Sequence, residues 1–505
     1  MTERDAAPPE VLPWLLATAV ALGVLGDVLL RGVPWGVNAV LWTAAVAVAT
    51  AGVLASVRPD AVRSTLPLLL AAIFFSGCIA WRDAGVLATW NGLATVLALG
   101  LGLLRGRRFS LAGSTIGEYV RDGVAAGVRL IAAPLSLLGS GWGTAPASPR
   151  RRSLIRRTAV GLLLALPVML VFGALLASAD PIFERAVRWL IDWDFEQLVS
   201  HLVLTAVLSW LAGGLLLTIA ASGPLWPFAD KLPRRPGLGL VEVGIPLAAL
   251  AVLFALFVVV QFRYLFGGED LVRATIGLTY ADYARRGFFE LVTATALVIP
   301  LLVAGDWFLD DSDGTIRRRF RWLAALLLAL VALIMVSAAE RLRLYVGTYG
   351  LTDTRVYAAA VMLWVGTVLA WFGATVLRGH RERFVVGSVV AGFVMLAMLN
   401  GANPDALVAR TNLGRAAAGA ELDLTYVARL GADAVPVLLE QSSELPDDTR
   451  CAIVALLAAK WNEVEDRDWR TWNVARYRAA RIVGESPIRL SPWRSELPPA
   501  CAPIR

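Results

Sequence analysis

Charged residues are scarce in this sequence. They make up 17% of its 505 residues, whereas a soluble domain carries about a quarter. Hydrophobic residues make up 57%, and the mean hydropathy is +0.65. They gather in runs long enough to cross a bilayer, which takes about 20 residues of helix. The shortage of charge therefore excludes a soluble globular protein of this length.

Lysine is also rare, and several catalytic motifs are missing. Lys231 and Lys460 are the two lysines beside 45 arginines, a composition typical of a GC-rich bacterial genome. Arginines in cytoplasmic loops account for the formal net charge of +7, so no nucleic-acid partner is predicted.

The sequence lacks Gly-x-Ser-x-Gly, His-Glu-x-x-His and a Walker phosphate-binding loop. We therefore predict no cofactor and no nucleotide-binding domain.

Eleven apolar runs predict an all-α fold, a polytopic bundle of transmembrane helices with a small C-terminal helical region outside the membrane. The first run has a mixed-charge flank and no small-residue cleavage site after it, so we expect a retained helix rather than a signal peptide. The predicted spans are residues 11–30, 33–57, 64–81, 86–104, 158–178, 202–221, 243–262, 288–308, 322–338, 356–377 and 384–399.

Arginines concentrate in alternate loops, which sets the predicted orientation. The loop at 105–157 holds ten arginines and is expected in the cytoplasm. With the C-terminal tail left aside, alternation gives the cytoplasmic side 23 Lys plus Arg and the other side 11. We predict a multi-pass protein of the bacterial cytoplasmic membrane, with its N-terminus in the cytoplasm and its C-terminus outside.

The same pattern divides the chain into five predicted parts. These are a four-helix membrane module (1–104), an Arg-rich cytoplasmic loop with an amphipathic interfacial helix (105–157), a seven-helix membrane core (158–400), an extracytoplasmic helical region (401–486) and a loose tail (487–505). The interfacial helix is expected at 116–133, where apolar residues recur at helical spacing. A second one is expected at 181–196, with Trp189 and Trp193 at headgroup level.

Histidines and cysteines are too few for most metal sites. His201 and His380 fall on opposite sides of the predicted topology, which disfavours a histidine-based site. No Cys-x-x-Cys motif is present, so neither zinc nor redox chemistry is predicted. Cys78 lies in an apolar run and is expected to be a small core residue. Cys451 and Cys501 could form a disulfide in an oxidising compartment.

Polar residues flank the spans in four clusters on the predicted extracytoplasmic side. Such residues near membrane depth are costly and often functional. In the second cluster, Asp282, Arg286 and Glu290 fall at i, i+4 and i+8, the spacing of an ion-pair ladder on a helix. We hypothesise one polar pocket at the outer mouth of the bundle; the alternative is local ion pairs at helix ends. The candidate residues are Asp180, Asp282, Tyr283, Arg286, Glu290, Glu340, Arg341, Arg343, Tyr345, Arg355, Asn403 and Asp405.

One of these clusters carries a family resemblance. The stretch Tyr-Ala-Asp-Tyr-Ala-Arg-Arg-Gly-Phe-Phe-Glu-Leu at 280–291 resembles the signature of a bacterial membrane family, domain of unknown function 4173, which is related to 4153. Shorter segments resemble it at 178–183, 342–345, 349–352, 403–405 and 423–426. The resemblance covers about residues 154–472 and leaves the first four spans outside. It implies a polytopic membrane protein and no particular activity.

Three classes of function fit these observations. We favour a membrane scaffold or sensory protein whose C-terminal extracytoplasmic region holds a protein partner. A small-solute or ion transporter is the alternative, supported by the helix count but lacking a Gly/Pro-broken helix pair or inverted repeat. An intramembrane enzyme acting on a lipid or envelope precursor ranks third, with Asp180 or Glu340 as acid or base. We therefore lean against an enzyme.

Overall fold

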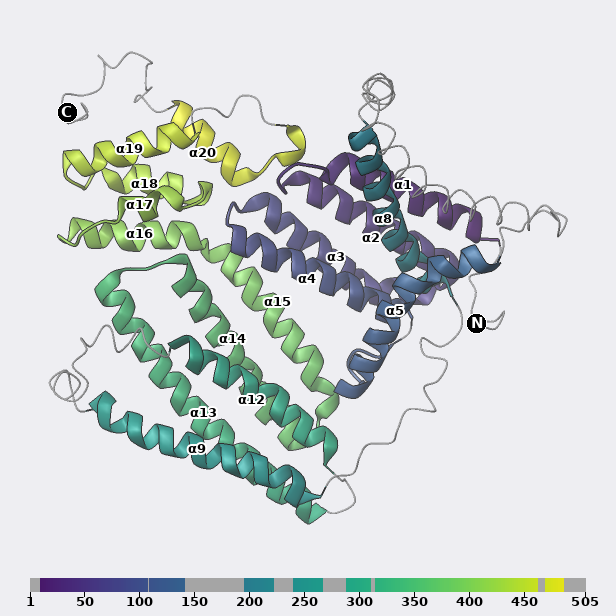
Figure 1. The fold of residues 1–505 in the computed structure, drawn as a ribbon, viewed down its shortest axis with the longest axis horizontal. Coiled ribbons are helices and arrows are strands. Elements are labelled where there is room, and N and C mark those ends of the chain that lie inside the picture. The colour runs from purple at the N-terminus through teal and green to yellow at the C-terminus, as the bar shows by residue number, and fades with distance from the viewer. Residues whose placement is uncertain are drawn as a thin grey trace, which may run out of the picture. The chain divides into compact units, whose positions relative to one another are not determined.

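The computed structural model describes residues 10–107, 109–140, 195–221, 239–266, 288–309, 314–461 and 468–485. Within these ranges the regular structure is helical, and ten helices are long and apolar enough to cross a membrane (Figure 1). The predicted all-α bundle of membrane-spanning helices is therefore confirmed.

The ten candidate spans follow the predicted apolar runs closely. They are α1 (Leu12–Leu30), α2 (Val37–Val57), α3 (Pro59–Trp81), α4 (Gly85–Gly106), α8 (Phe195–Ala220), α9 (Leu240–Phe266), α12 (Phe288–Phe308), α13 (Gly314–Tyr349), α14 (Asp353–Thr375) and α15 (Phe384–Ala402). The shorter helices are η3 (Val376–Arg378), η4 (Arg381–Arg383), α16 (Pro404–Ala417), α17 (Leu424–Arg429), η5 (Ala432–Ala434), α18 (Val435–Ser442), α19 (Asp447–Trp461), η6 (Trp469–Thr471) and α20 (Val474–Glu485). The predicted span at 158–178 lies outside the described residues.

Several spans are longer than predicted, and α3 and α13 show the physical reason. Helix α3 begins at Pro59 rather than at residue 64, because proline is well suited to the first helical position and the polar turn after it continues the helix. Helix α13 has 36 residues, because the charged residues on both sides of its apolar run stay helical. The apolar run marks what the bilayer covers, and the helix extends beyond it.

The described helices group into two compact units. The first holds α1, α8, most of α2, the start of α3 and the second part of α5 (Ile116–Ser140). Helices α1 and α8 approach closely at Gly23, where a Cβ would lie 2.6 Å from the carbonyl oxygen of Thr205. Asp27 on α1 is paired there with Arg31 and with Nδ1 of His201, each 2.5 Å away. A carboxylate inside a span is thus paired, as the cost of burying charge requires.

The second unit holds the remaining helices around two buried clusters. One cluster packs α9, α12, α13 and α14 around Phe320 and Phe372. The other joins α4, α14 and α15 to α16–α20 through Leu87, Val408 and Leu413. We call α16–α20 (residues 404–485) the cap, and Figure 1 shows it at one end of α14 and α15. The two units interleave along the chain, and the predicted module boundaries stay a prediction.

Helix α5 carries the predicted apolar stripe. Val120, Val124, Val128 and Ile131 are each more than half exposed, at 60%, 55%, 54% and 60%. An apolar stripe that the described residues leave largely exposed suits a helix that lies on a membrane surface, although that location stays a prediction. The second interfacial helix, predicted at 181–196, falls almost entirely outside the described residues.

Candidate functional site

Beneath the cap, the short loop between α3 and α4 carries two charged side chains. Arg82 donates from Nη1 to Oδ1 of Asp433 over 2.8 Å and from Nε to the carbonyl oxygen of Asn400 over 2.8 Å. The side chains of Arg82 and Asp433 are 12% and 5% exposed. A buried ion pair persists only when further hydrogen bonds satisfy both groups, and the contact to Asn400 supplies one of them.

Asp83 extends this contact into a network. Its backbone N–H donates to Oδ2 of Asp433 over 2.7 Å. Its carboxylate accepts from the backbone N–H of Ala432 over 3.1 Å and from Nε of Arg476 over 2.7 Å. Two carboxylates and two guanidinium groups therefore alternate between the α3–α4 loop and the cap. We call this network, with Asn473 and Asp405, the polar junction.

Asn473, directly before α20, attaches the cap to the end of α3. Its Nδ2 donates to the carbonyl oxygens of Ile79 and Arg82, both over 2.9 Å. These are carbonyls at the end of α3, which lack helical partners of their own. At the start of α2, the N–H of Val37 donates to the carbonyl of Trp472 over 2.9 Å. The segment leading into α20 therefore closes the ends of two spans.

Asp405 lies where the last span turns into the cap. Asn403 adopts a left-handed conformation with φ 55° and caps α16, accepting from the N–H of Ala406 over 3.3 Å. This turn directs Asp405 inward, where its Oδ2 accepts from the N–H of Gly431 over 2.9 Å. A Cβ at Gly431 would lie 2.1 Å from the carbonyl oxygen of Asp83, so only glycine allows the two chain segments to come this close.

Burial sets the electrostatics of the junction. Loss of water is the largest cause that raises the pKa of Asp405 to about 6; the neighbouring carboxylates of Asp433, Asp353 and Asp83 act in the same direction, and the hydrogen bond from Gly431 opposes them. Burial also raises the pKa of Asp433, although Arg82 opposes the shift. A carboxyl group with a raised pKa is more stable in its neutral form. The junction therefore holds a carboxyl group that titrates close to neutral pH.

Two amides lie in the spans directly below. Asn91 on α4 and Asn400 on α15 exchange hydrogen bonds, each 2.9 Å long, and both residues are fully buried. Interhelical amide pairs of this kind hold membrane helices together. The pair fixes α4 against α15 immediately beneath the cap.

A second set of contacts joins the α13–α14 loop to the cap. Asn412 on α16 accepts from the N–H of Leu351 over 2.8 Å and donates to its carbonyl over 2.7 Å. The hydroxyl of Tyr426 donates to Oδ1 of Asp353 over 3.0 Å. Arg355 lies 3.9 Å above the ring centre of Tyr345. The cap is thus attached to two separate loops of the bundle.

The structure distributes the described candidate residues among several contacts. Glu340 and Arg343 pair with each other at 2.6 Å on an exposed face of α13, and Arg341 beside them is buried. Glu290 is exposed in the first turn of α12. Asn403 and Asp405 belong to the junction, while Tyr345 and Arg355 lie at the second loop. Asp180, Asp282, Tyr283 and Arg286 lie outside the described residues, so a single pocket shared by all twelve stays a prediction.

Sequence reasoning missed most of the junction. Arg82, Asp83, Asp433, Asn473 and Arg476 read as ordinary residues of loops and exposed helices, since their partners lie hundreds of residues away. Asn91 and Asn400 could have indicated a polar contact between spans, because a primary amide inside an apolar run needs a hydrogen-bond partner.

The described residues include both histidines and two of the three cysteines. Within the described ranges no group of three or more His, Cys, Asp or Glu could hold a metal ion. Cys78 is a buried free thiol. Cys451 lies in α19, whereas Cys501 lies outside the described residues, so their disulfide stays a prediction.

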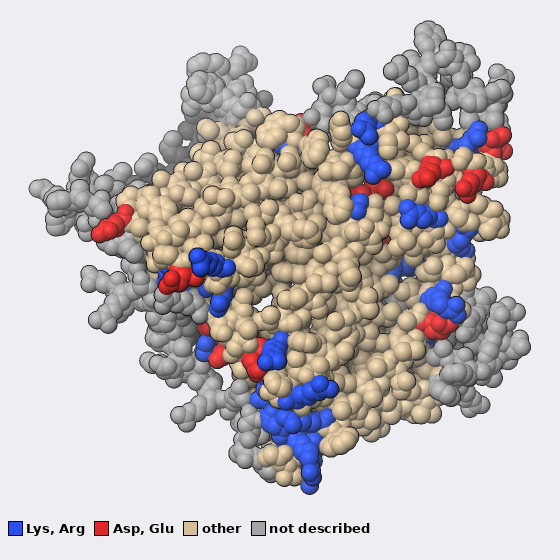
Figure 2. Space-filling view, turned by 180° about the vertical axis from the view of Figure 1, so that it is seen from behind, with Lys and Arg blue, Asp and Glu red and all other residues tan. Residues whose placement is uncertain are grey.

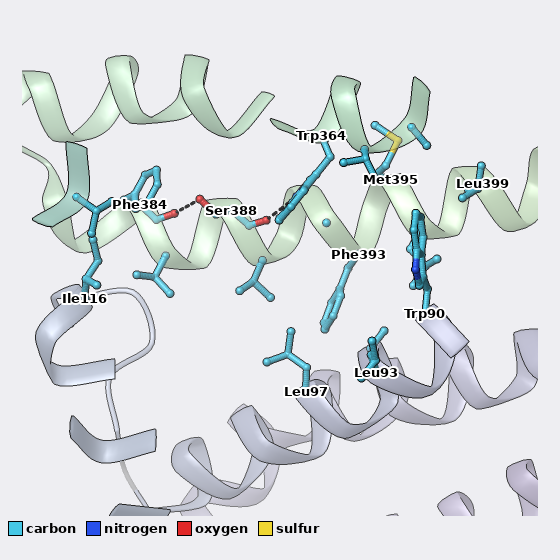
Figure 3. Close-up of a pocket in the computed structure, with 18 residues that line it drawn as sticks. Trp90, Leu93, Leu97, Ile116, Trp364, Phe384, Ser388, Phe393, Met395 and Leu399 are labelled. Atoms are coloured by element: carbon cyan, nitrogen blue, oxygen red, sulfur yellow. Dashed lines mark hydrogen bonds between the residues drawn. The ribbon is translucent and has the colours of Figure 1, made fainter. Parts of the chain in front are cut away.

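An apolar groove runs along the membrane-spanning part of the second unit. It has a volume of about 490 Å³ and is lined mainly by α4, α14 and α15 (Figure 3). Trp90 and Leu97 line it from α4, and Phe384 and Leu399 mark its extent along α15. The lining of the groove is therefore apolar, in contrast to the polar junction under the cap.

These features define an integral membrane protein with a polytopic helical bundle. The family model for a domain of unknown function, DUF4153, matches residues 69–441, and the chain belongs to this family. It is the relative of the family that the motifs resembled; membership of 4173 itself is not shown. The match begins within α3, so the α3–α4 loop and α4 lie inside the family, contrary to the extent expected from the motifs. No curated protein and no solved structure matches the chain.

Proposed function

We propose that this chain is a membrane scaffold or sensory protein whose cap binds a protein partner outside the cytoplasm. The observation that carries the proposal is the buried attachment of the cap to the bundle. Arg82, Asp83 and Asn473 tie it to the ends of the spans, and removing one partner of a buried ion pair is strongly destabilising. A cap held in this way positions a bound partner, and it transmits force from that partner to the spans.

The arginine distribution supports the proposed orientation. Arg318 and Arg319 near the start of α13, with Arg378 and Arg383 between α14 and α15, are exposed at the end of the bundle opposite the cap. Figure 2 shows Lys and Arg side chains gathered at the lower end of the view. Positively charged ends face the cytoplasm in most membrane proteins. The cap then faces outward, which agrees with an extracytoplasmic C-terminus in a cell membrane.

Transport and enzymatic catalysis receive less support. A transporter needs a polar path to the membrane centre, and the groove between α4 and α15 is apolar. The envelope-enzyme hypothesis places Asp180 or Glu340 beside a lipid-sized opening. Glu340 instead pairs with Arg343 and does not line the groove, and Asp180 lies outside the described residues.

Site-specific photo-crosslinking in intact cells tests the partner proposal. A photoreactive residue at Glu440 of α18, Asp448 of α19 or Tyr477 of α20 samples exposed positions on three cap helices. We expect a discrete protein adduct from at least one of them, and its loss when Arg82→Gln is added.

A matched position in the bundle controls for random collisions. Val390 is 52% exposed on α15, and we expect a photoreactive residue there to give lipid adducts without that protein band. Lipid adducts alone at all three cap positions would refute partner binding and would instead favour a cap that only rests on the bilayer.

A further inference from the structure

The groove is lined almost entirely by apolar groups. Its two polar groups nearest the middle are turned toward α15: Oγ of Ser388 donates to the carbonyl of Phe384 over 2.8 Å, and Nε1 of Trp364 donates to the carbonyl of Ser388 over 3.5 Å (Figure 3). The surface between them is formed by aliphatic and aromatic side chains such as Leu97 and Phe393. A solute that requires hydrogen bonds would gain little there.

The dimensions fit a lipid chain better than a helix. Phe384 and Leu399 are fifteen residues apart on α15, which corresponds to about 22 Å at the helical rise. A helix of that length and about 10 Å diameter occupies roughly 1,700 Å³. The groove holds about 490 Å³, so a slender chain can lie within it, whereas a helix of a partner protein or a second copy would lie mostly outside it.

One end of the groove opens beside basic residues. Phe384 lines that end, and Arg383, directly before it, is exposed. Val303 on α12 lines the same end, and Asp306, three residues further on, pairs with Arg381 at 2.7 Å. Asp306 is thereby neutralised, and it also lies 3.7 Å from Arg317. Glu382 lies beside Arg383, but four arginines (Arg317, Arg378, Arg381 and Arg383) outnumber Asp306 and Glu382, so the local charge at this end is positive.

We propose that the groove binds one acyl chain of an anionic glycerophospholipid, with the lipid phosphate held at the basic end by Arg383 and Arg378. Guanidinium groups bind phosphate oxygens through paired hydrogen bonds, and basic pockets between spanning helices recognise anionic headgroups. The apolar groove selects a lipid, and the arginines select its charge. This proposal is independent of a protein partner at the cap.

Native mass spectrometry of the full-length protein tests the proposal. The protein is released from nanodiscs of equal parts phosphatidylglycerol and phosphatidylcholine. We expect one phosphatidylglycerol to be retained per chain. Val389→Trp fills the groove, because Val389 lines it, and should remove the bound lipid. Val390→Trp adds the same side chain at the neighbouring exposed position and should retain it.

The headgroup contact has its own matched pair of variants. Replacing Arg378 and Arg383 by Gln should lower the preference for phosphatidylglycerol over phosphatidylcholine by about thirtyfold, the effect of losing two arginines near a membrane surface at about 1 kcal/mol each. Replacing Arg318 and Arg319 by Gln removes the same charge from α13, which does not line the groove, and should leave the preference unchanged. Equal retention of the two lipids by the unmodified protein, or equal effects of the Val389 and Val390 variants, would overturn the proposal. A lipid-free dimer that Val389→Trp dissociates would overturn it as well.

Discussion

Arg82 at the end of α3 donates a hydrogen bond to Asp433 in the cap, over 2.8 Å and across 351 residues of sequence. The pair is buried, and the other carboxylate oxygen of Asp433 accepts a hydrogen bond from the backbone N–H of Asp83. A single turn between two spans therefore positions a domain formed from the far end of the chain.

Removing this pair should loosen the cap. Breaking a buried ion pair from one side costs about 3–5 kcal/mol, so Arg82→Gln should increase hydrogen exchange at the backbone amides of α16–α20 in the full-length protein. Arg450→Gln is the matched control, because Arg450 pairs with Asp447 on an exposed surface and such pairs contribute little. Equal protection in both variants would show that the junction does not hold the cap.

The cap should be more stable in mild acid than at neutral pH. Asp405 has a pKa of about 6 in the folded protein, against an ordinary value of 3.8. The folded state therefore binds more protons than the unfolded state between these values, and its free energy of unfolding falls as pH rises through this window. The difference between the two pKa values corresponds to about 3 kcal/mol of stability, which Asp405 contributes below pH 4 and loses as the pH rises to 6.

Asp405→Asn tests that dependence on pH. Between pH 4 and pH 7, the protection factors of the cap amides against hydrogen exchange, which are corrected for the intrinsic effect of pH on exchange, should change less in this variant than in the unmodified protein. Asp448→Asn, at an exposed position on α19, should keep the full change. A pH response that survives in Asp405→Asn would assign it to another group, with Asp433 as the next candidate because burial raises its pKa as well.

A methyl group at Gly431 should separate the cap from the α3–α4 loop. The added Cβ would lie 2.1 Å from the carbonyl oxygen of Asp83 and 2.6 Å from Oδ2 of Asp405. Because the nearest atom is backbone, we expect Gly431→Ala to lower the free energy of unfolding by about 1–3 kcal/mol. Gly401→Ala adds a methyl group in open space and should be neutral or stabilising. Thermal unfolding followed by tryptophan fluorescence compares them, and similar midpoints would contradict the close approach.

The predicted disulfide between Cys451 and Cys501 can be read from intact mass. An extracytoplasmic cap would meet an oxidising compartment, so the purified protein should have the mass of a chain lacking two hydrogens and gain them on reduction. A Cys451→Ser variant should show no such change. Two alkylated thiols at these positions without prior reduction would argue against both the disulfide and the exposure of the cap to that compartment.

The spans could be predicted because each depends on its own residues. Helix α12 has both predicted ends, at Phe288 and Phe308, since an apolar run of bilayer length forms a helix wherever its neighbours lie. The ends of α3 and α13 were predicted less well, because polar residues continue a helix without an apolar signal.

The junction could not be predicted because it depends on tertiary contacts. Asp83 lies in a three-residue loop, and nothing near it in the sequence shows that Arg476 is its partner. Asp405 was selected for its position after the last span, and its burial against Gly431 follows only from the fold. Polar residues are easy to find in an apolar chain, but their partners require the structure.

The most direct measurement of the central claim is the location of the cap. A variant with its three native cysteines replaced receives one cysteine, at Asp448 in the cap or at Arg318 near the start of α13, both exposed. Each is exposed in intact cells to a maleimide that cannot cross the membrane. We predict labelling at Asp448→Cys and none at Arg318→Cys until the membrane is permeabilised. Labelling at position 318 and protection at 448 would place the cap in the cytoplasm and contradict the proposed function.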